Sequence, residues 1–328
     1  MLKKHGFILA LIGSIILAYL DPQIGARGGP MRAEAISKLG VMVIFLLQGL
    51  SLRTRELAGG MRQFKLHGFI QLWIFVLSAI VLVLSALILK ALSLHHLADG
   101  FLYLALIPTT ISSAVAFTSA AKGNVPVAIF NTTLSNIIGV FWVPTGCLLL
   151  FAAGGTFQSG LIAPMLWKVA QLILLPMIIG QLARPFVYQS NWFKKIAPRF
   201  KLVNHSIIIF IVYSAFCQSI ASNSWDGIGA GSIVILLLLT LMAVLVIHGG
   251  AWITGKLITT KLEDRITILF CGAQKTLAAG APMAVAIFSQ TEQLSQVNLG
   301  LLLLPLLCYH PIQLFLAALL LPGFTRAR

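Results

Sequence analysis

Ten long apolar runs follow one another along the 328-residue chain, with short connections between them. A helix needs about 20 apolar residues to cross the hydrocarbon core of a bilayer, so each run is a candidate membrane span. Only 9% of the residues are charged and 59% are hydrophobic, so a soluble protein of this length would lack a polar surface. The sequence therefore predicts an all-α integral membrane protein. The expected spans are about 6–20, 35–51, 67–90, 99–121, 125–152, 162–182, 203–222, 228–254, 266–288 and 297–321.

Basic residues are distributed unevenly between the two sides of these spans. Of the 23 Lys and Arg residues, 17 lie on the side that holds the N-terminus, five lie on the other side and Lys275 lies within a span. Loops rich in Lys and Arg face the cytoplasm, so both termini are expected to be cytoplasmic. The same rule explains the net charge of +15 without a nucleic-acid partner. Lys3 and Lys4 also fit the start of a signal peptide, but no small-residue cleavage site ends the first run, which favours an uncleaved helix.

The ten spans are compatible with two groups of five, which would lie inverted in the membrane because five is odd. The basic connection at 183–202 is interpreted as a cytoplasmic linker between two halves. Spans 99–121 and 266–288 hold matching positions, and Gly, Pro and small polar residues interrupt both. Paired interruptions indicate a binding site at the midplane of a transporter, whereas for either segment alone close helix packing is the better explanation.

One charged side chain, Lys275, lies deep within a predicted span, whereas all eight acidic residues lie in loops or at span ends. An ionisable residue at that depth is costly and is a functional candidate, although a Lys can also pair with the carbonyls of a helix end. Without a carboxylate in the hydrocarbon region, coupling through a buried Asp or Glu and aspartyl-protease chemistry are both excluded. The four cysteines form no CxxC pair, so no disulfide, metal site or cofactor is expected.

Neutral polar residues gather on the neighbouring spans. Thr132 and Asn136 are four residues apart and share a helix face, and Gln71 lies in the third span. His310 and Gln313 are three residues apart on one face of the last span. For any one of these residues, an interhelical hydrogen bond is the more usual role. Together with Lys275, the candidate ion- and substrate-binding residues are Gln71, Ser112, Ser113, Thr132, Asn136, Gln274, Thr276 and His310.

Several of these segments resemble the bile acid:sodium symporter superfamily, and the resemblance extends over nearly the whole chain. The run GAQKTLA at 272–278 is similar to the crossover helix of that superfamily. Ser113, the run GNV at 123–125 and the run TTLS at 132–135 resemble its fourth and fifth spans. The segments closer to its divergent bacterial branch are GFLYL at 100–104, FTS at 117–119 and FCG at 270–272.

The resemblance implies a single transmembrane transporter unit, residues 1–328, with ten helices in two inverted five-helix repeats. A panel domain would hold spans 1, 2, 6 and 7, at about 6–51 and 162–222. A core domain would hold spans 3–5 and 8–10, at about 67–152 and 228–321. Spans 4 and 9 would be broken helices that cross at the midplane, and movement of the core against the panel would alternate access. A location in a bacterial inner membrane follows from the same resemblance.

The sodium-coupled members of that superfamily hold two sodium ions behind the crossover. This chain departs from them at four matching positions: Ala114 replaces an Asn, Ala128 a Ser, Phe270 the Glu shared by both sodium sites, and Lys275 an Asn. Sodium prefers hard oxygen ligands, so these losses leave a degenerate site and no confident metal site. The matching positions that keep an oxygen-bearing side chain are Gln71, Ser113, Thr132 and Gln274.

The expected function is secondary active transport of a small organic anion, either sterol-like or another amphipathic acid. Lys275 would either replace sodium as a tethered cation or release its proton and couple the cargo to proton movement. The sequence identifies no carboxylate or His near Lys275 as a relay, which favours the tethered cation. The alternative is a membrane regulatory or binding protein that keeps the fold without transport. An enzyme is disfavoured because no local motif pairs a nucleophile with a His. The expected partners are the anion and the bilayer; sodium is disfavoured and a coupling proton is left open.

Overall fold

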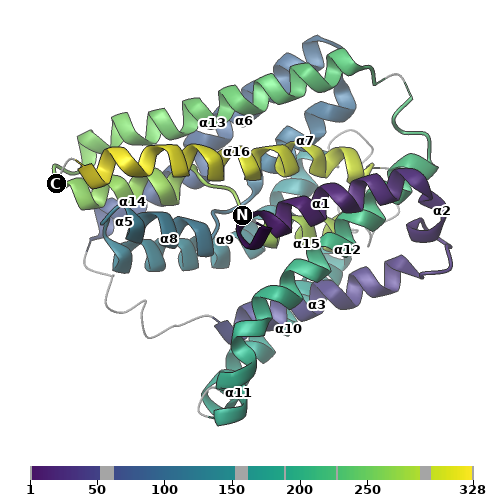
Figure 1. Ribbon diagram of the computed structural model, residues 1–328, viewed down its shortest axis with the longest axis horizontal. Coiled ribbons are helices and arrows are strands. Elements are labelled where there is room, and N and C mark those ends of the chain that lie inside the picture. Colours follow the sequence, from purple (N-terminus) through teal and green to yellow (C-terminus); the bar gives the residue numbers. More distant parts are fainter. Residues whose placement is uncertain are drawn as a thin grey trace. The chain divides into compact units, whose positions relative to one another are not determined.

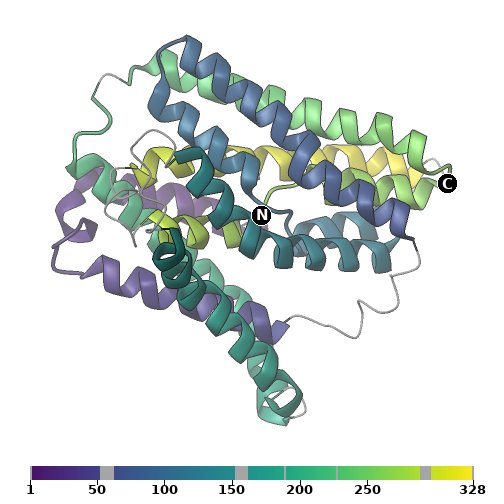
Figure 2. The same ribbon diagram turned by 180° about the vertical axis from the view of Figure 1, so that it is seen from behind.

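The computed structural model of the chain describes residues 2–51, 63–151, 162–187, 190–226, 228–288 and 297–326. Within these ranges every regular element is a helix and none is a strand, as the sequence predicts (Figure 1, Figure 2). The elements are α1 (Leu2–Leu20), α2 (Pro22–Gly25), α3 (Ala33–Ser51), α5 (Phe64–Leu72), the π-helix η1 (Trp73–Leu77), α6 (Ser78–Ala91), α7 (His95–Leu106), α8 (Ser112–Ala120), α9 (Val125–Phe151), α10 (Ile162–Val187), α11 (Asn191–Ile196), the 3-10 helix η3 (Ala197–Arg199), α12 (Phe200–Ala221), α13 (Ala230–Ile258), α14 (Leu262–Ala273), α15 (Leu277–Phe288) and α16 (Leu299–Arg326).

Eight helical segments in the described ranges are long and apolar enough to cross a membrane. The apolar part of α1, Gly6–Leu20, is shorter than these, and the run expected at 99–121 forms the two short helices α7 and α8. The chain is therefore a multi-pass membrane protein, while the number of ten spans stays a prediction. The eight segments are Ala33–Ser51, Phe64–Ala91, Val125–Phe151, Trp167–Val187, Ala197–Ala221, Ala230–Ile258, Leu262–Phe288 and Leu299–Phe324.

The expected linker at 183–202 is largely helical. Helix α10 continues to Val187, and α11 and η3 follow before α12 begins at Phe200. Ser190 starts α11 as an N-cap, because its hydroxyl accepts a hydrogen bond from the Phe193 N–H at 3.2 Å. Phe193 is buried against Leu47 and Leu50 of α3. Basic composition alone does not indicate this amphipathic packing.

The chain divides into two compact units, each built from three stretches of sequence. The first unit consists of Met1–Leu52, Pro144–Gly227 and Ala278–Leu303. The second consists of Arg53–Val143, Ile228–Leu277 and Leu304–Arg328. The assignment of spans to a panel and a core stays a prediction from the resemblance.

Within the first unit, α3 and α10 lie side by side in both views (Figure 1, Figure 2). Glycines allow this approach. A Cβ atom at Gly49 would overlap the carbonyl of Met177, and one at Gly180 would overlap the carbonyl of Leu46. Contacts between small residues are typical of helix pairs in membranes, where close van der Waals packing replaces the hydrophobic effect.

Two helix interruptions lie in the second unit. Helix α7 ends at Leu106 and α8 begins at Ser112, while α14 ends at Ala273 and the next helix begins at Leu277. Pro108 has no N–H to extend α7, and the residue before it is extended, with φ −70° and ψ 135°. The two interruptions touch, because the Thr276 N–H donates to the Pro108 carbonyl at 3.0 Å. The first break thus lies at Pro108 and the second at 274–276, both within the predicted interruptions, whereas Pro282 lies inside α15.

Candidate functional site

Lys275 lies in the interruption between α14 and α15 and is completely buried, at 0% exposure. Its ammonium group donates to three backbone carbonyls. The Nζ atom is 2.9 Å from the Ile74 oxygen, 2.9 Å from the Ile107 oxygen and 3.5 Å from the Ala105 oxygen. An ammonium has three donors and no acceptor, so this arrangement satisfies the whole group with neutral oxygen ligands.

Two of these carbonyls are available because α7 ends beside them. The last carbonyls of a helix have no N–H partner within the helix, and they carry the negative end of the helix dipole. Ala105 belongs to the last turn of α7, and Ile107 is its C-cap residue. The break in this helix therefore produces an electronegative site without using a carboxylate.

The third carbonyl, that of Ile74, is released by the π-helix η1. The Ser78 N–H donates to the carbonyl of Trp73, five residues earlier, and so bypasses Ile74. The Ser78 hydroxyl and the Lys275 ammonium take its place, at 2.7 and 2.9 Å from the Ile74 oxygen. Single π-turns within α-helices occur frequently at functional sites.

The backbone of Lys275 is held separately from its side chain. Gln313 of α16 accepts the Lys275 N–H at 2.7 Å and donates to the Lys275 carbonyl at 2.8 Å. His310 contacts the Gln313 Nε2 atom through Nδ1, at 2.9 Å, as the shared helix face predicts. The Tyr309 hydroxyl donates to the Ala273 carbonyl at 2.8 Å. Both His310 and Gln313 thus lie at the break, and His310 reaches Lys275 through Gln313.

Gln274, the residue before Lys275, turns towards α8. Its Oε1 atom accepts the Ser113 hydroxyl at 2.6 Å, and its Nε2 atom is buried without a partner among the described residues. Thr276 contributes its backbone N–H to the contact with Pro108. Ser112 is exposed at the start of α8, so its role stays a prediction.

The polar residues of α9 join the first interruption to α5. The Asn136 amide donates to the Thr109 carbonyl at 2.9 Å and to the Thr132 carbonyl at 2.8 Å. The Thr132 hydroxyl donates to Ala128 of its own helix, at 2.8 Å. Gln71 donates to Asn131 rather than to the Lys275 environment. The side-chain oxygens of Gln71, Ser113 and Thr132 therefore do not hold the ammonium; backbone carbonyls do.

A model of the SBF-like CPA transporter family matches residues 5–326 of the chain. The chain belongs to this family. It is 32% identical over 326 residues to Sodium/bile acid cotransporter 7-B of Xenopus laevis, a match that covers 98% of this chain and 92% of that protein. It is 33% identical over 329 residues to Sodium/bile acid cotransporter 7 of Danio rerio, covering 98% and 94% of the two chains. It is 30% identical over 325 residues to "Putative symporter YfeH" of Escherichia coli (strain K12), covering 98% and 92%.

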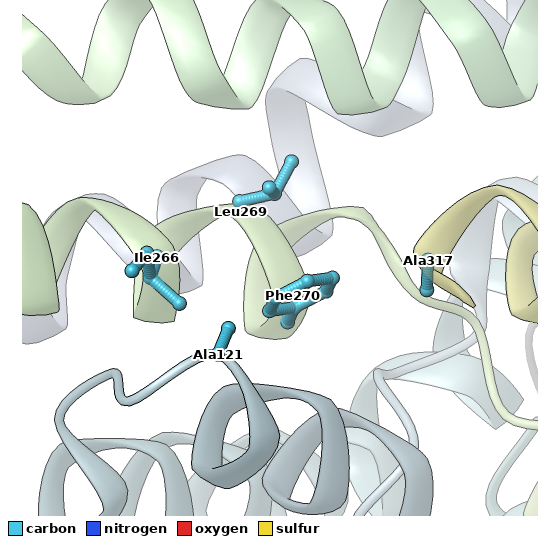
Figure 3. Packing of buried hydrophobic residues seen from close by; sticks show 5 residues of the cluster. All are labelled: Ala121, Ile266, Leu269, Phe270 and Ala317. Carbon is cyan, nitrogen blue, oxygen red and sulfur yellow. The ribbon is translucent and has the colours of Figure 1, made fainter. Parts of the chain in front are cut away.

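These relatives bear the names of cotransporters and symporters, so the resemblance is confirmed and the chain is a transporter-family protein rather than an enzyme. The positions where oxygen ligands are expected to be missing are apolar and fully buried in this fold. Phe270 packs in a cluster with Ala121, Ile266, Leu269 and Ala317 (Figure 3). Its ring centre is also 5.7 Å from that of Phe117. A hydrophobic cluster therefore packs against the side chain at this position.

The sequence predicts helix-end carbonyls as partners of Lys275, but it does not identify those of Ile74, Ala105 and Ile107, which have no side-chain signature. Tyr309, which contacts the same break, is not among the expected site residues. A signal was present for it, because Tyr309 is four residues before Gln313 and shares its helix face. Asp264 lies at the start of α14 as expected, but it is buried, where the Asn124 amide donates to it at 2.8 Å.

Proposed function

We propose that this protein is a secondary transporter of an organic anion, working by alternating access, with Lys275 in the place of a coupling sodium ion. The carbonyl site of Lys275, at the contact between two helix breaks, is the observation that supports this function most. The proposal includes ten spans in two inverted repeats, a panel and a core, and cytoplasmic termini in a bacterial inner membrane. The basic asymmetry of the sequence supports the orientation.

The replacement of sodium is supported by the chemistry of the ligands. Backbone carbonyls are the hard, neutral oxygen ligands that a bare alkali cation also prefers. Removing an ammonium from water costs several kcal/mol even after relaxation, so a chain keeps one at this depth only where it serves a role. Ala114, Ala128 and Phe270 supply no oxygen at the positions that resemble sodium ligands. A tethered cation would hold the crossover together without a dissociable ion.

The nature of the cargo is supported by charge and by the relatives. The crossover carries one positive charge, on Lys275, and no acidic side chain among the described residues pairs with it, which favours an anion. The relatives named as sodium/bile acid cotransporters indicate an amphipathic organic acid. We therefore infer a cargo with one anionic group and a largely apolar body.

Two alternative functions can be weighed against the contacts of the site. In one, Lys275 releases its proton during transport; its three carbonyl partners oppose this, because carbonyls stabilise only the charged form. In the other, the protein binds an organic acid as a regulator and does not transport it. The apolar replacements at the degenerate sodium site favour that alternative, and the continuous polar contacts between the two breaks oppose it.

The proposal is tested by counterflow in proteoliposomes. Thermal-shift screening of purified protein against organic acids selects the cargo, and uptake of labelled cargo is then measured against an excess of unlabelled cargo inside. Lys275→Met keeps the length of the side chain and removes its charge, and it should abolish counterflow. Lys256→Met is the matched control, because Lys256 is exposed on α13.

The outcomes separate the alternatives. Normal counterflow by Lys275→Met would show that the lysine is structural and would refute its proposed role. Cargo binding without counterflow in the unmodified protein would identify a binding protein. Counterflow that needs no sodium and shows no change between pH 6 and 8 in the unmodified protein would support the tethered cation against titration of Lys275.

A further inference from the structure

A cavity of about 200 Å³ lies within the first unit, and none of its lining residues belongs to the site around Lys275. Its walls come from the α2–α3 connection and the start of α3, from the second half of α12 and the turn after it, and from α15 and the start of α16. One part of the wall is polar and contains the ion pair between Arg27 and Glu34. The cavity therefore has a charged part and an apolar part. The apolar part includes Ile211, Ala215, Val285 and Phe288.

Ser37 of α3 is a buried polar group of this cavity that has no partner. Its side chain is only 4% exposed and lines the cavity, and its hydroxyl makes no hydrogen bond among the described residues. Ser14 of the same unit is also buried, but it donates to the Leu11 carbonyl at 2.7 Å. A buried hydroxyl without a partner is destabilising, so each such group in a native structure needs an explanation. A ligand in the cavity would supply the missing hydrogen bond.

Two amide side chains of the cavity use their oxygen atoms for the protein backbone. The Gln218 Oε1 atom accepts the Arg27 N–H at 2.9 Å, and the Asn298 Oδ1 atom accepts the Leu301 N–H at 3.1 Å at the start of α16. The amide nitrogens of Gln218 and Asn298 can only donate, and they have no partner among the described residues. The amides thus offer donors to a ligand, and a ligand that suits them carries acceptor oxygens.

Arg27 adds a charged donor to these groups. Its Nε atom lies 3.0 Å from the Glu34 Oε1 atom, and the two side chains are 43% and 52% exposed, so a ligand can reach them. A guanidinium has five N–H donors, and the ion pair through Nε leaves the two terminal nitrogens for a ligand. Two parallel hydrogen bonds from a guanidinium are the usual way in which an arginine holds a carboxylate. Glu34 therefore orients the guanidinium and leaves its end available.

We propose that this cavity binds a small organic monocarboxylate, with Arg27, Ser37 and the two amides around the carboxylate and the apolar wall around its body. The size of the cavity indicates the size of that body. An apolar cavity of about 150 Å³ holds benzene, so about 200 Å³ suits a single ring with its carboxylate. Leu299, in the first turn of α16, also lines the cavity, and the positive end of a helix dipole favours an anion. The inference goes beyond the proposed function, because binding at this separate site needs no transport.

Binding is tested by saturation-transfer-difference NMR of purified protein in detergent micelles, with benzoate as the probe. Benzamide has nearly the same shape without the charge, so its dissociation constant should be about tenfold higher than that of benzoate. Arg27→Gln keeps a hydrogen-bond donor and removes the charge, and it should weaken benzoate binding at least about tenfold. Arg199→Gln, the same substitution at an exposed site on η3, is the matched control and should leave the dissociation constant unchanged.

Two further variants change the site in opposite directions. Glu34→Gln keeps an oxygen for the Arg27 Nε atom and removes the negative charge beside the ligand, so it should strengthen benzoate binding about threefold. This increase decides the matter if Arg27→Gln fails to fold. Ser37→Ala should weaken benzoate binding about threefold, because it removes one donor to the carboxylate. Ser14→Ala, whose hydroxyl bonds within α1, controls for the loss of a buried hydroxyl and should leave binding unchanged.

The outcomes also separate this site from the one around Lys275. Lys275→Met should bind benzoate like the unmodified protein, and a loss of binding in that variant alone would place benzoate at the lysine and overturn the inference. The inference would equally be overturned if benzoate showed no saturable binding, if benzamide bound as well as benzoate, or if neither Arg27→Gln nor Glu34→Gln changed the dissociation constant. None of these measurements needs transport, so a failure of counterflow leaves them unaffected.

Discussion

The two hydrogen bonds from Gln313 to the Lys275 backbone, here called the clamp, predict how much Gln313→Leu lowers the free energy of unfolding. Gln313 is fully buried, and its amide makes two hydrogen bonds to the backbone of one residue, to the N–H of Lys275 at 2.7 Å and to its carbonyl at 2.8 Å. A buried polar group left without a partner costs about 1–3 kcal/mol. Interhelical side-chain hydrogen bonds in membranes average only about 0.6 kcal/mol, because the reference state finds other partners.

The position of Lys275 decides between these two magnitudes. Its peptide lies in a break, where no helical hydrogen bond can replace the lost ones. We therefore expect Gln313→Leu to lower the free energy of unfolding by about 2–3 kcal/mol, since two groups are orphaned and leucine preserves most of the volume. His310→Ala should cost less, because both bonds from Gln313 to Lys275 remain.

The assay is reversible unfolding in mixed micelles of increasing SDS fraction, followed by circular dichroism. Gln23→Leu, exposed on α2, controls for the chemical change alone. A loss below about 0.5 kcal/mol, which is the usual effect of a surface substitution, would refute the clamp. A loss by His310→Ala that equals that of Gln313→Leu would instead place the stabilisation in the histidine.

Three further predictions concern ions, helix ends and topology. Replacing potassium by sodium at 150 mM should not raise the melting temperature. An intact sodium site would do so, because a ligand at 100 times its dissociation constant adds about 2.7 kcal/mol to the free energy of unfolding. A saturable rise that Gln274→Ala abolishes would contradict the degenerate site. Asn124 and Asn298 each cap a helix, but Asn124 also donates to buried Asp264. In SDS unfolding, Asn124→Ala should therefore lower the free energy of unfolding by about 1–3 kcal/mol more than Asn298→Ala does. Equal losses would show that Asp264 needs no partner. A cysteine at position 326 should resist impermeant maleimides in intact cells, and periplasmic labelling would reverse the orientation.

The sequence predicts the parts of this site that depend on unusual residues in apolar surroundings. Lys275 is conspicuous because an ammonium at that depth is costly, and the two breaks are marked by Pro108 in the first and by polar residues in the second. The pairing of His310 with Gln313 follows from their spacing on one helix face. In each of these cases a local pattern carries the information.

The sequence predicts that carbonyls of a helix end can hold Lys275, but it does not identify which ones, because backbone atoms have no side-chain signature. Ile74 is one apolar residue among many, and its carbonyl becomes available only through a π-turn, which composition does not encode. Ser112 and Ser113 also show the limit of sequence proximity. A step of about 100° around the helix leaves Ser112 exposed and directs Ser113 to Gln274.

The proposed function predicts how transport responds to membrane potential. By resemblance, the sodium-coupled members of the superfamily place one Glu and two sodium ions at the crossover, a net charge of one positive. In the proposed function Lys275 supplies the same net charge from within the chain, because Phe270 stands in the place of the Glu. A tethered cation, unlike sodium, would not cross the membrane with the cargo.

Uptake of a monovalent anion alone opposes an inside-negative potential, which costs about 2.3 kcal/mol per 100 mV for each charge. Potassium gradients with valinomycin set the potential in proteoliposomes. Because a tethered cation does not cross with the cargo, the accumulation ratio of the unmodified protein should fall about tenfold for each 60 mV, inside negative. A ratio that does not change with potential would show that a coupling ion travels with the anion.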